Sequence, residues 1–243
     1  MCVICYIPKE AKEPKKEDLL AMWNKNPHGA GIMWRTENQV SFSKGYMDFN
    51  NFYRDFLIIK RDYNFECAVH FRIATSGGIN KQMCHPFPIT NSETKIKIER
   101  GSSDVMIMHN GIISISPRKG LNDTCEYIID ELYPTYKKDK RFFLHLKESD
   151  ENKIQNRIGY SKLLFFSKEG IKMIGDWKKF HDCYCSNLSF ETPNYSTYQN
   201  ANKKYNSNFK YGYLFDDEET YDSYYKFFNY SNPTYPKKIY SQK

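Results

Sequence analysis

Short apolar runs bounded by turn residues recur along the chain and predict β-strands. The first is CVICYI (2–7), which stops at Pro8, and a longer one is CAVHFRIAT (67–75), which leads into a glycine-rich turn. Pairs of such runs joined by turn residues predict hairpins. The predicted hairpins span residues 29–43, 104–115 with Asn110-Gly111 at the turn, and 160–176 with Glu169-Gly170 at the turn.

Other segments carry apolar residues at helical spacing and are bounded by helix start and stop signals. These predicted helices are 16–25, 48–59 with Asp48 as the N-cap, 122–132 ending before Pro134, and 140–157. The mixture of hairpins and intervening helices predicts an α+β fold in which helices cover the sheets.

Length and composition indicate a globular protein. The chain has 243 residues, of which 40% are hydrophobic, which is enough to bury a substantial core. No apolar run approaches the roughly 20 residues that cross a bilayer. The N-terminus also becomes charged soon after CVICYI, which is too early for a signal peptide. A cytoplasmic protein is therefore expected, in the host cytoplasm if a phage encodes it, with no membrane partner.

Charge and composition also bear on partners and on domain organisation. The formal net charge is +7, but Lys, Asn, Tyr and Ile are abundant throughout. That bias is more typical of an AT-rich genome than of a surface for nucleic acid. Beyond about residue 190 the chain becomes rich in Tyr, Asn and Lys and poor in aliphatic residues. We expect one globular domain over 1–190 and a C-terminal extension over 191–243.

The cysteines predict neither a disulfide framework nor a metal site. There are seven, an odd number in a chain of this length. Cys183 and Cys185 form a C-x-C pair, but no second pair at metal spacing accompanies them, and structural zinc requires four ligands. Cys2 and Cys5 lack partners in the same way. Because side chains alternate along a strand, Cys5 is expected in the core, on the opposite face from Cys2.

Cys2 has the features of an N-terminal nucleophile once Met1 is removed. A thiol with a reference pKa of about 8.5 needs only modest help to ionise. The α-amine of the same residue, with a reference pKa of about 7.7–8.0, is partly neutral at physiological pH and can act as the base. Many proteins begin with Met-Cys, so this signal is weak by itself.

Three downstream elements strengthen the interpretation. Arg72 ends a strand, and its planar guanidinium matches a carboxylate in bidentate fashion, which lysine cannot do. Asn110-Gly111 is ordinarily a hairpin turn, but it also supplies a side-chain amide beside a backbone N–H, the two donors of an oxyanion hole. Asp123 at a helix start is most simply an N-cap, and its carboxylate also suits a substrate ammonium group.

These elements, in this order, resemble class II glutamine amidotransferases, which are N-terminal nucleophile hydrolases. The matching segments are Met1-Cys2, HFRIATSGG (70–78), MHNGII (108–113) and NDT (122–124). Three further segments, NPHGAGIMW (26–34), KGYM (44–47) and CHPFPI (84–89), are similar to stand-alone members in phages and bacteria. The resemblance covers about residues 1–175.

The resemblance implies a four-layer αββα sandwich of two antiparallel sheets and hydrolysis of glutamine to glutamate and ammonia. Carried over by motif, the functional roles are nucleophile for Cys2, oxyanion hole for Asn110 and Gly111, carboxylate binding for Arg72 and Thr75, and amine binding for Asp123. No cofactor and no metal are expected. Because the chain lacks a G-x-x-x-x-G-K phosphate loop, ammonia is expected to pass to a separate synthase or acceptor protein.

Two positions depart from the family pattern. Val3 stands where the family commonly has Gly, and Ser76, which we include among the substrate-binding candidates, stands where it commonly has His. Two alternatives therefore stay open: a non-catalytic binding protein that retains the fold, and a cysteine amidohydrolase acting on another small amide. Nucleic-acid binding through the C-terminal extension is not expected.

The histidines near the motifs are interpreted in two ways. His70 and His109 are expected to be packed strand residues, whereas His28 and His85 lie in loops and are candidates to line a pocket.

Overall fold

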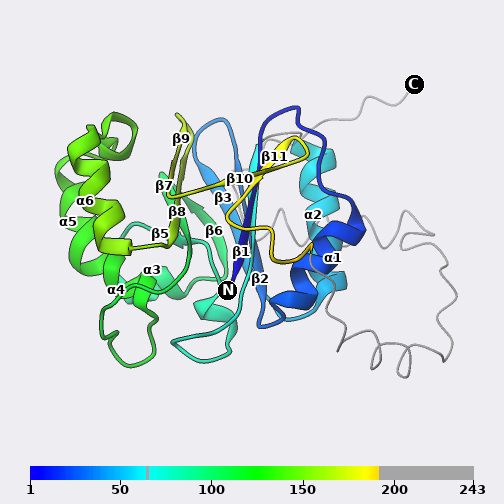
Figure 1. Ribbon diagram of the computed structural model, residues 1–243, viewed down its shortest axis with the longest axis horizontal. Helices are drawn as coiled ribbons and strands as arrows, with labels where there is room; N and C mark the ends of the chain where they lie inside the picture. The colour runs from blue at the N-terminus through cyan, green and yellow to red at the C-terminus, as the bar shows by residue number, and fades with distance from the viewer. Residues whose placement is uncertain (64–65, 192–243) are drawn as a thin grey trace, which may run out of the picture. The chain divides into compact units, whose positions relative to one another are not determined.

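The computed structural model describes residues 1–63 and 66–191. The C-terminal extension beyond residue 191 lies outside the described residues. Within them, helices combine with two antiparallel sheets (Figure 1), which confirms the predicted mixture of helices and antiparallel sheets. None of the helices in this part of the chain has both the length and the apolar character needed to cross a membrane.

The larger sheet has seven strands in the order β10-β11-β1-β4-β2-β3-β6. Its strands are β1 (Val3–Ile7), β2 (Ala30–Arg35), β3 (Val40–Tyr46), β4 (Cys67–Phe71), β6 (Arg100–Ser103), β10 (Lys178–Phe180) and β11 (Cys183–Cys185). The smaller sheet has the order β5-β7-β8-β9. Its strands are β5 (Phe87–Pro88), β7 (Val105–Asn110), β8 (Lys162–Ser167) and β9 (Ile171–Ile174). The topology places β11, late in the chain, beside β1.

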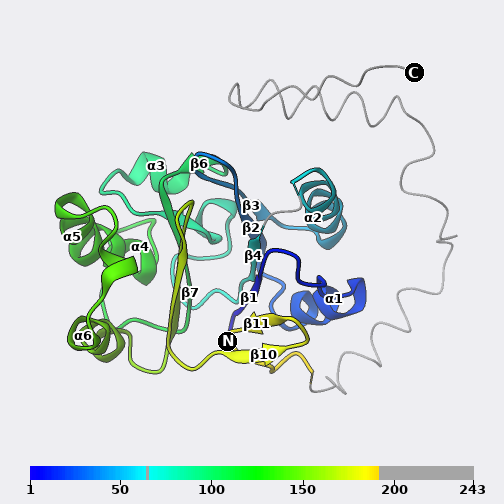
Figure 2. The same ribbon diagram turned by 90° about the horizontal axis from the view of Figure 1, so that it is seen from above.

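Helices cover the outer face of each sheet, as Figures 1 and 2 show. The larger sheet is covered by α1 (Lys16–Lys25) and α2 (Phe49–Tyr63). The smaller sheet is covered by α4 (Asp123–Tyr127), a π-helical turn (Ile128–Leu132), α5 (Tyr133–Lys138) and α6 (Glu148–Ile158). The other helical segments are α3 (Glu93–Lys97) and 3₁₀ turns at Lys81–Met83 and Phe142–His145.

Alternation along the strands divides the buried side chains into three clusters. On β1, Val3, Cys5 and Ile7 pack with α1 and α2, whereas Ile4 and Tyr6 pack between the two sheets. The third cluster lies between the smaller sheet and its helices. Cys5 is therefore a core residue, as predicted. Cys2 has the parity of Ile4 and Tyr6, so its side chain is directed towards the space between the sheets.

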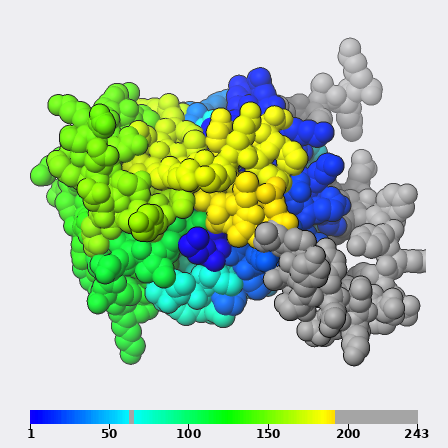
Figure 3. Space-filling model, viewed as in Figure 1, coloured from blue at the N-terminus to red at the C-terminus, as the bar shows by residue number. Residues whose placement is uncertain are grey.

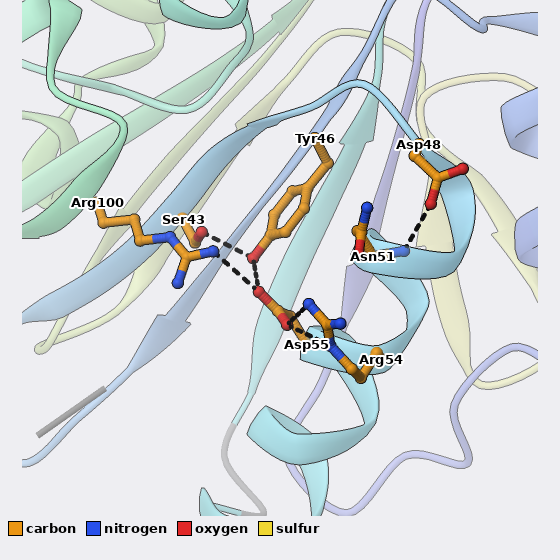
Figure 4. Close-up of polar contacts among 7 residues, drawn as sticks. All are labelled: Ser43, Tyr46, Asp48, Asn51, Arg54, Asp55 and Arg100. Atoms are coloured by element: carbon orange, nitrogen blue, oxygen red, sulfur yellow. Dashed lines mark hydrogen bonds and ion pairs between the residues drawn. The ribbon is translucent and has the colours of Figure 1, made fainter. Parts of the chain in front are cut away.

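A buried carboxylate joins α2 to the larger sheet (Figure 4). Asp55 accepts a hydrogen bond from the Tyr46 hydroxyl at 2.7 Å and another from the Arg100 guanidinium at 3.2 Å, and the Arg54 guanidinium lies 3.4 Å away. A buried carboxylate without such partners would cost several kcal/mol. The cationic and hydroxyl donors around Asp55 therefore allow α2 to pack against β3 and β6.

Several predicted boundaries are wrong. The strand predicted over 67–75 ends at Phe71, and the helix predicted over 140–157 begins at Glu148. Residues 111–115 do not return as the second strand of a hairpin, because the Ile113 N–H donates to the Asp123 carboxylate at 2.8 Å, and β7 pairs with β5 and β8. The helical segment also does not stop before Pro134. This proline lies in the first turn of α5, where a missing N–H is tolerated.

Candidate active site

Strand register brings Cys2 beside the loop that follows β4. Val3 lies opposite Phe71 in the antiparallel pair, so the residue before β1 meets the residues after β4. The Ile73 N–H donates to Cys2 Sγ at 3.2 Å, and Sγ lies 3.4 Å from the Ile73 carbonyl oxygen. All seven cysteines lie within the described residues, and Cys2 alone is not fully buried. Figure 3 shows the N-terminal end of the chain, in dark blue, at the molecular surface.

The surroundings of the Cys2 thiol act on its pKa in opposite directions. Burial raises the pKa above its ordinary value, whereas the Ile73 N–H, the Arg72 charge and the N-terminal amine lower it. Burial prevails, so the thiol is protonated at neutral pH. A nucleophilic role for Cys2 therefore requires a neighbouring base, which the α-amine of the same residue can supply.

Arg72 is a buried residue rather than a solvated one. Its side chain is 3% exposed and donates to the carbonyl oxygens of Gly78 at 2.7 Å and Ser76 at 2.8 Å. These two bonds hold the loop after β4 around the guanidinium. Since a guanidinium carries five N–H donors, three donors remain for which no hydrogen bond is found among the described residues. Thr75 lies in the same loop and is exposed.

Asn110 is the last residue of β7, and Gly111 follows it. Asn110 has the parity of Met106 and Met108, which pack between the two sheets. Asn110 is 2% exposed, and its Nδ2 lies 2.8 Å from Ser186 Oγ. Gly111 has φ +146°, and a Cβ at this position would lie 2.0 Å from Ser161 Oγ. Only glycine fits both this backbone conformation and this close approach.

Asp123 is not the helix N-cap that its position suggested. Asn122 caps α4, its side chain accepting from the Cys125 N–H at 2.9 Å. The Asp123 carboxylate instead accepts from the Ile113 N–H at 2.8 Å and from the Ser76 hydroxyl at 3.2 Å. It therefore joins the segment after β7 to the loop after β4, and it brings two of the predicted site residues into contact.

Ser186 and Asn187, which sequence reasoning missed, link the remaining candidates. Asn187 Nδ2 donates to the Cys2 carbonyl oxygen at 2.8 Å, and Ser186 Oγ contacts both Asn110 and the Ile4 N–H. In the chain as described, no hydrogen bond joins Cys2 to Asn110 directly. No motif marks these two residues, since their proximity to Cys2 results from the pairing of β11 with β1.

Three histidines adjoin the site from within the core. His70, His85 and His109 are each no more than 5% exposed, and the ring centroids of His70 and His85 are 4.3 Å apart. Both ring nitrogens of His85 are buried without a hydrogen-bond partner among the described residues. His85 is thus a core residue, while His28, the other loop candidate, accepts from the Ala74 N–H at 3.0 Å. Over the same residues, no group of His, Cys, Asp and Glu is arranged to hold a metal ion.

The histidine cluster predicts a loss of stability in mild acid. Burial lowers the pKa of His70 to about 3, lowers that of His109 to about 4, and lowers that of His85 well below its ordinary value. In the unfolded chain histidine has a pKa of about 6.5. As the pH falls below about 6.5, the unfolded state therefore binds protons that the folded state does not. The free energy of unfolding should fall by about 1.4 kcal/mol per pH unit for each histidine.

Urea unfolding between pH 7.5 and pH 4.5 measures this dependence. The variant His85→Phe should have a shallower dependence than the wild type, by about 1.4 kcal/mol per pH unit. The control is His181→Asn, because His181 is exposed and Asn suits its φ of +51°. An unchanged slope in His85→Phe would contradict the prediction. Lys44 adds a separate pH dependence that is the same in both proteins. Burial lowers its pKa from 10.5 to about 7, so this contribution to stability falls as the pH falls from about 10.5 to about 7.

Comparison with solved structures shows a distant structural likeness. No family model matches the chain, and no curated protein sequence matches it. Among solved structures, the chain is similar to glutamine phosphoribosylpyrophosphate amidotransferase from B. subtilis, complexed with ADP and GMP, with a TM-score of 0.44 and 14% sequence identity. The match covers 76% of this chain and 41% of that chain, so this chain spans about two fifths of the length of that protein.

Proposed function

We propose that this chain is a glutaminase-type amidotransferase domain with the four-layer αββα architecture of N-terminal nucleophile hydrolases. One observation carries the proposal. The register of β1 on β4 places the thiol of Cys2, a partly exposed residue, against Ile73, the residue next to the buried Arg72. The same loop contacts the Asp123 carboxylate through Ser76. A thiol, a cation and an anion thus border one site, which are the groups that a free amino acid bearing a side-chain amide requires.

In the proposed reaction Cys2, freed of Met1, is the nucleophile. Its α-amine takes the thiol proton, Sγ forms a bond to the amide carbon of glutamine, and the carbonyl electron pair moves to oxygen. The Asn110 amide and the Gly111 N–H donate to that oxyanion. The carbon–nitrogen bond then breaks, and the proton held by the α-amine leaves with ammonia. Water next adds to the thioester, which releases glutamate and restores the thiol.

The remaining candidates would bind the α-carboxylate and the α-ammonium group of the substrate. Arg72 suits the α-carboxylate, because its guanidinium is buried and held in a fixed direction by two loop carbonyls. Asp123 suits the α-ammonium group, and Ser76 orients its carboxylate. Thr75 is proposed as a further contact to the carboxylate. Ammonia would pass to a separate synthase or acceptor protein.

The substitution of Val3 for the family's common glycine has a structural explanation. Val3 is fully buried and belongs to the cluster between the larger sheet and its helices. Its side chain is therefore directed away from the space between the sheets, towards which Cys2 is directed. In the proposal, Val3 stabilises β1 and does not enter the site.

The proposal predicts that both ends of the amino acid are recognised. Free glutamine should be hydrolysed at least about 100-fold faster, as kcat/KM, than N-acetylglutamine or the α-amide of glutamine, because each capped compound leaves a charged group of the site unpaired. Glutamate formation with each compound measures this difference. Equal rates for free and capped compounds would overturn recognition of glutamine and favour a general cysteine amidohydrolase.

A further inference from the structure

Residues 186 and 187 hold the strand that carries the candidate nucleophile. They follow β11, and the Ser186 N–H donates to the Ile4 carbonyl oxygen at 2.9 Å. The Ile4 N–H donates in return to Ser186 Oγ at 2.9 Å, and Asn187 Nδ2 donates to the Cys2 carbonyl oxygen at 2.8 Å. Ser186 is 1% exposed. Its hydroxyl group is therefore held in place from the backbone of β1, two residues after Cys2.

The Ser186 hydroxyl oxygen also lies 2.8 Å from the side-chain amide of Asn110. The number of donors and acceptors around this hydroxyl group indicates which amide atom of Asn110, Nδ2 or Oδ1, is directed at it. The Ile4 N–H can only donate, so it occupies one lone pair of Ser186 Oγ. If Asn110 Nδ2 also donates, the hydroxyl proton has no acceptor among the described residues. Asn110 Oδ1 is then also left buried without a partner among the described residues.

A half turn of the Asn110 amide gives both the hydroxyl proton and Oδ1 a partner and leaves Nδ2 as the amide atom without one among the described residues. The amide keeps nearly the same shape, so its hydrogen-bonding partners decide its orientation. With Oδ1 towards Ser186, the hydroxyl donates to Oδ1 while it still accepts from the Ile4 N–H. Nδ2 then takes the position that otherwise holds the unpartnered Oδ1. This position would repel an oxyanion if it held a carbonyl oxygen, and it would bind one if it held an NH₂ group.

From this geometry we infer that Ser186 is a positioning residue, which donates its hydroxyl proton to Asn110 Oδ1 and so directs Asn110 Nδ2 at the reacting carbonyl. The inference rests on the proposed glutaminase function and gives a reason for the contact between Ser186, the residue after β11, and Asn110, the last residue of β7. Through the Ile4 N–H, one hydroxyl group fixes the oxyanion donor relative to the nucleophile's own strand. Ser186 does not touch the substrate and acts only through Asn110.

Kinetics of three variants test the role of Ser186. The variant Ser186→Ala should lower kcat for glutamine by about 10- to 100-fold while KM changes by less than about threefold, because the oxyanion contact forms only in the transition state. Ser186→Thr, which restores the hydroxyl, should recover most of this loss. The matched control is Ser167→Ala, since Ser167 is also a buried serine but lies at the far end of β8 and contacts Gly170. An unchanged kcat in Ser186→Ala, or equal changes in kcat and KM, would overturn the inference.

A second measurement is independent of activity. Neutron diffraction from crystals of the deuterated wild-type protein distinguishes nitrogen from oxygen and locates deuterium atoms directly. A deuterium on Ser186 Oγ directed at Asn110 Oδ1 supports the inference, and a deuterium on Asn110 Nδ2 directed at Ser186 Oγ overturns it. If the wild-type protein released no glutamate, the proposed function would fail, whereas the neutron result would still decide the orientation of the Asn110 amide.

Discussion

Replacement of Cys2 by alanine is expected to reduce glutamate release from glutamine by about 10⁴-fold or more, because no other group in the site can form the thioester. Cys2 is the partly exposed residue before β1, and within the described residues its thiol forms hydrogen bonds only with the Ile73 backbone. The free energy of unfolding should therefore change by less than about 1 kcal/mol. Steady-state glutamate formation and urea unfolding measure the two quantities on the same preparation.

Cys5→Ala is the matched control for this variant. Cys5 lies on the same strand, but it is fully buried in the cluster with α1 and α2. Its removal should lower stability by about 1–2 kcal/mol through loss of buried volume and should leave glutamate release within about threefold of the wild type. A Cys2→Ala protein that retained more than about one hundredth of the wild-type rate would contradict the role of Cys2 as nucleophile.

Replacement of Asn110 by alanine is expected to lower kcat by about 10²- to 10³-fold, which is the typical effect of removing one oxyanion donor. KM should change by less than about threefold, because the amino-acid end of the substrate is assigned to Arg72 and Asp123. The expected pattern is thus a loss in kcat alone. Initial rates of glutamate formation over a range of glutamine concentrations separate the two constants.

Asn26→Ala controls for the loss of a buried asparagine. Asn26 is 1% exposed and donates to the Met22 carbonyl oxygen at the end of α1, where none of the site candidates is located. This variant should lose stability through the broken hydrogen bond and keep its kcat. If Asn110→Ala raised KM while kcat stayed constant, Asn110 would be a binding residue and not an oxyanion donor.

Local patterns predicted much of the secondary structure. Helical spacing predicted α1 over 16–25 with the bounds that the structure shows, and Asp48 accepts from the Asn51 N–H at 3.0 Å at the predicted start of α2. The hairpin expected over 104–115 failed because a tertiary contact prevailed over the turn signal. Asn110-Gly111 is a common hairpin turn, but the following amide at Ile113 is satisfied by the Asp123 carboxylate instead of a strand partner.

The candidate site was only partly predictable. The motifs indicated residue types, and their proximity depended on strand register, as in the contact between Cys2 and Ile73. The capping role of Asn122 in place of Asp123 depended on which side chain reached the Cys125 N–H, which the sequence NDT does not decide. No sequence motif marks Ser186, because its partner Ile4 lies 182 residues earlier in the chain and the two meet only through the pairing of β11 with β1.

Glutamate release by protein that begins at Cys2 tests the central claim most directly. Intact mass establishes whether Met1 is absent, and a preparation in which Met1 is retained serves as the comparison. The account predicts that the protein lacking Met1 forms glutamate and ammonia in equal amounts. The protein with Met1 should form at least about 100-fold less, because the free α-amine is the base that a thiol with a burial-raised pKa requires. No glutamate from either preparation, or equal amounts from both, would contradict the account.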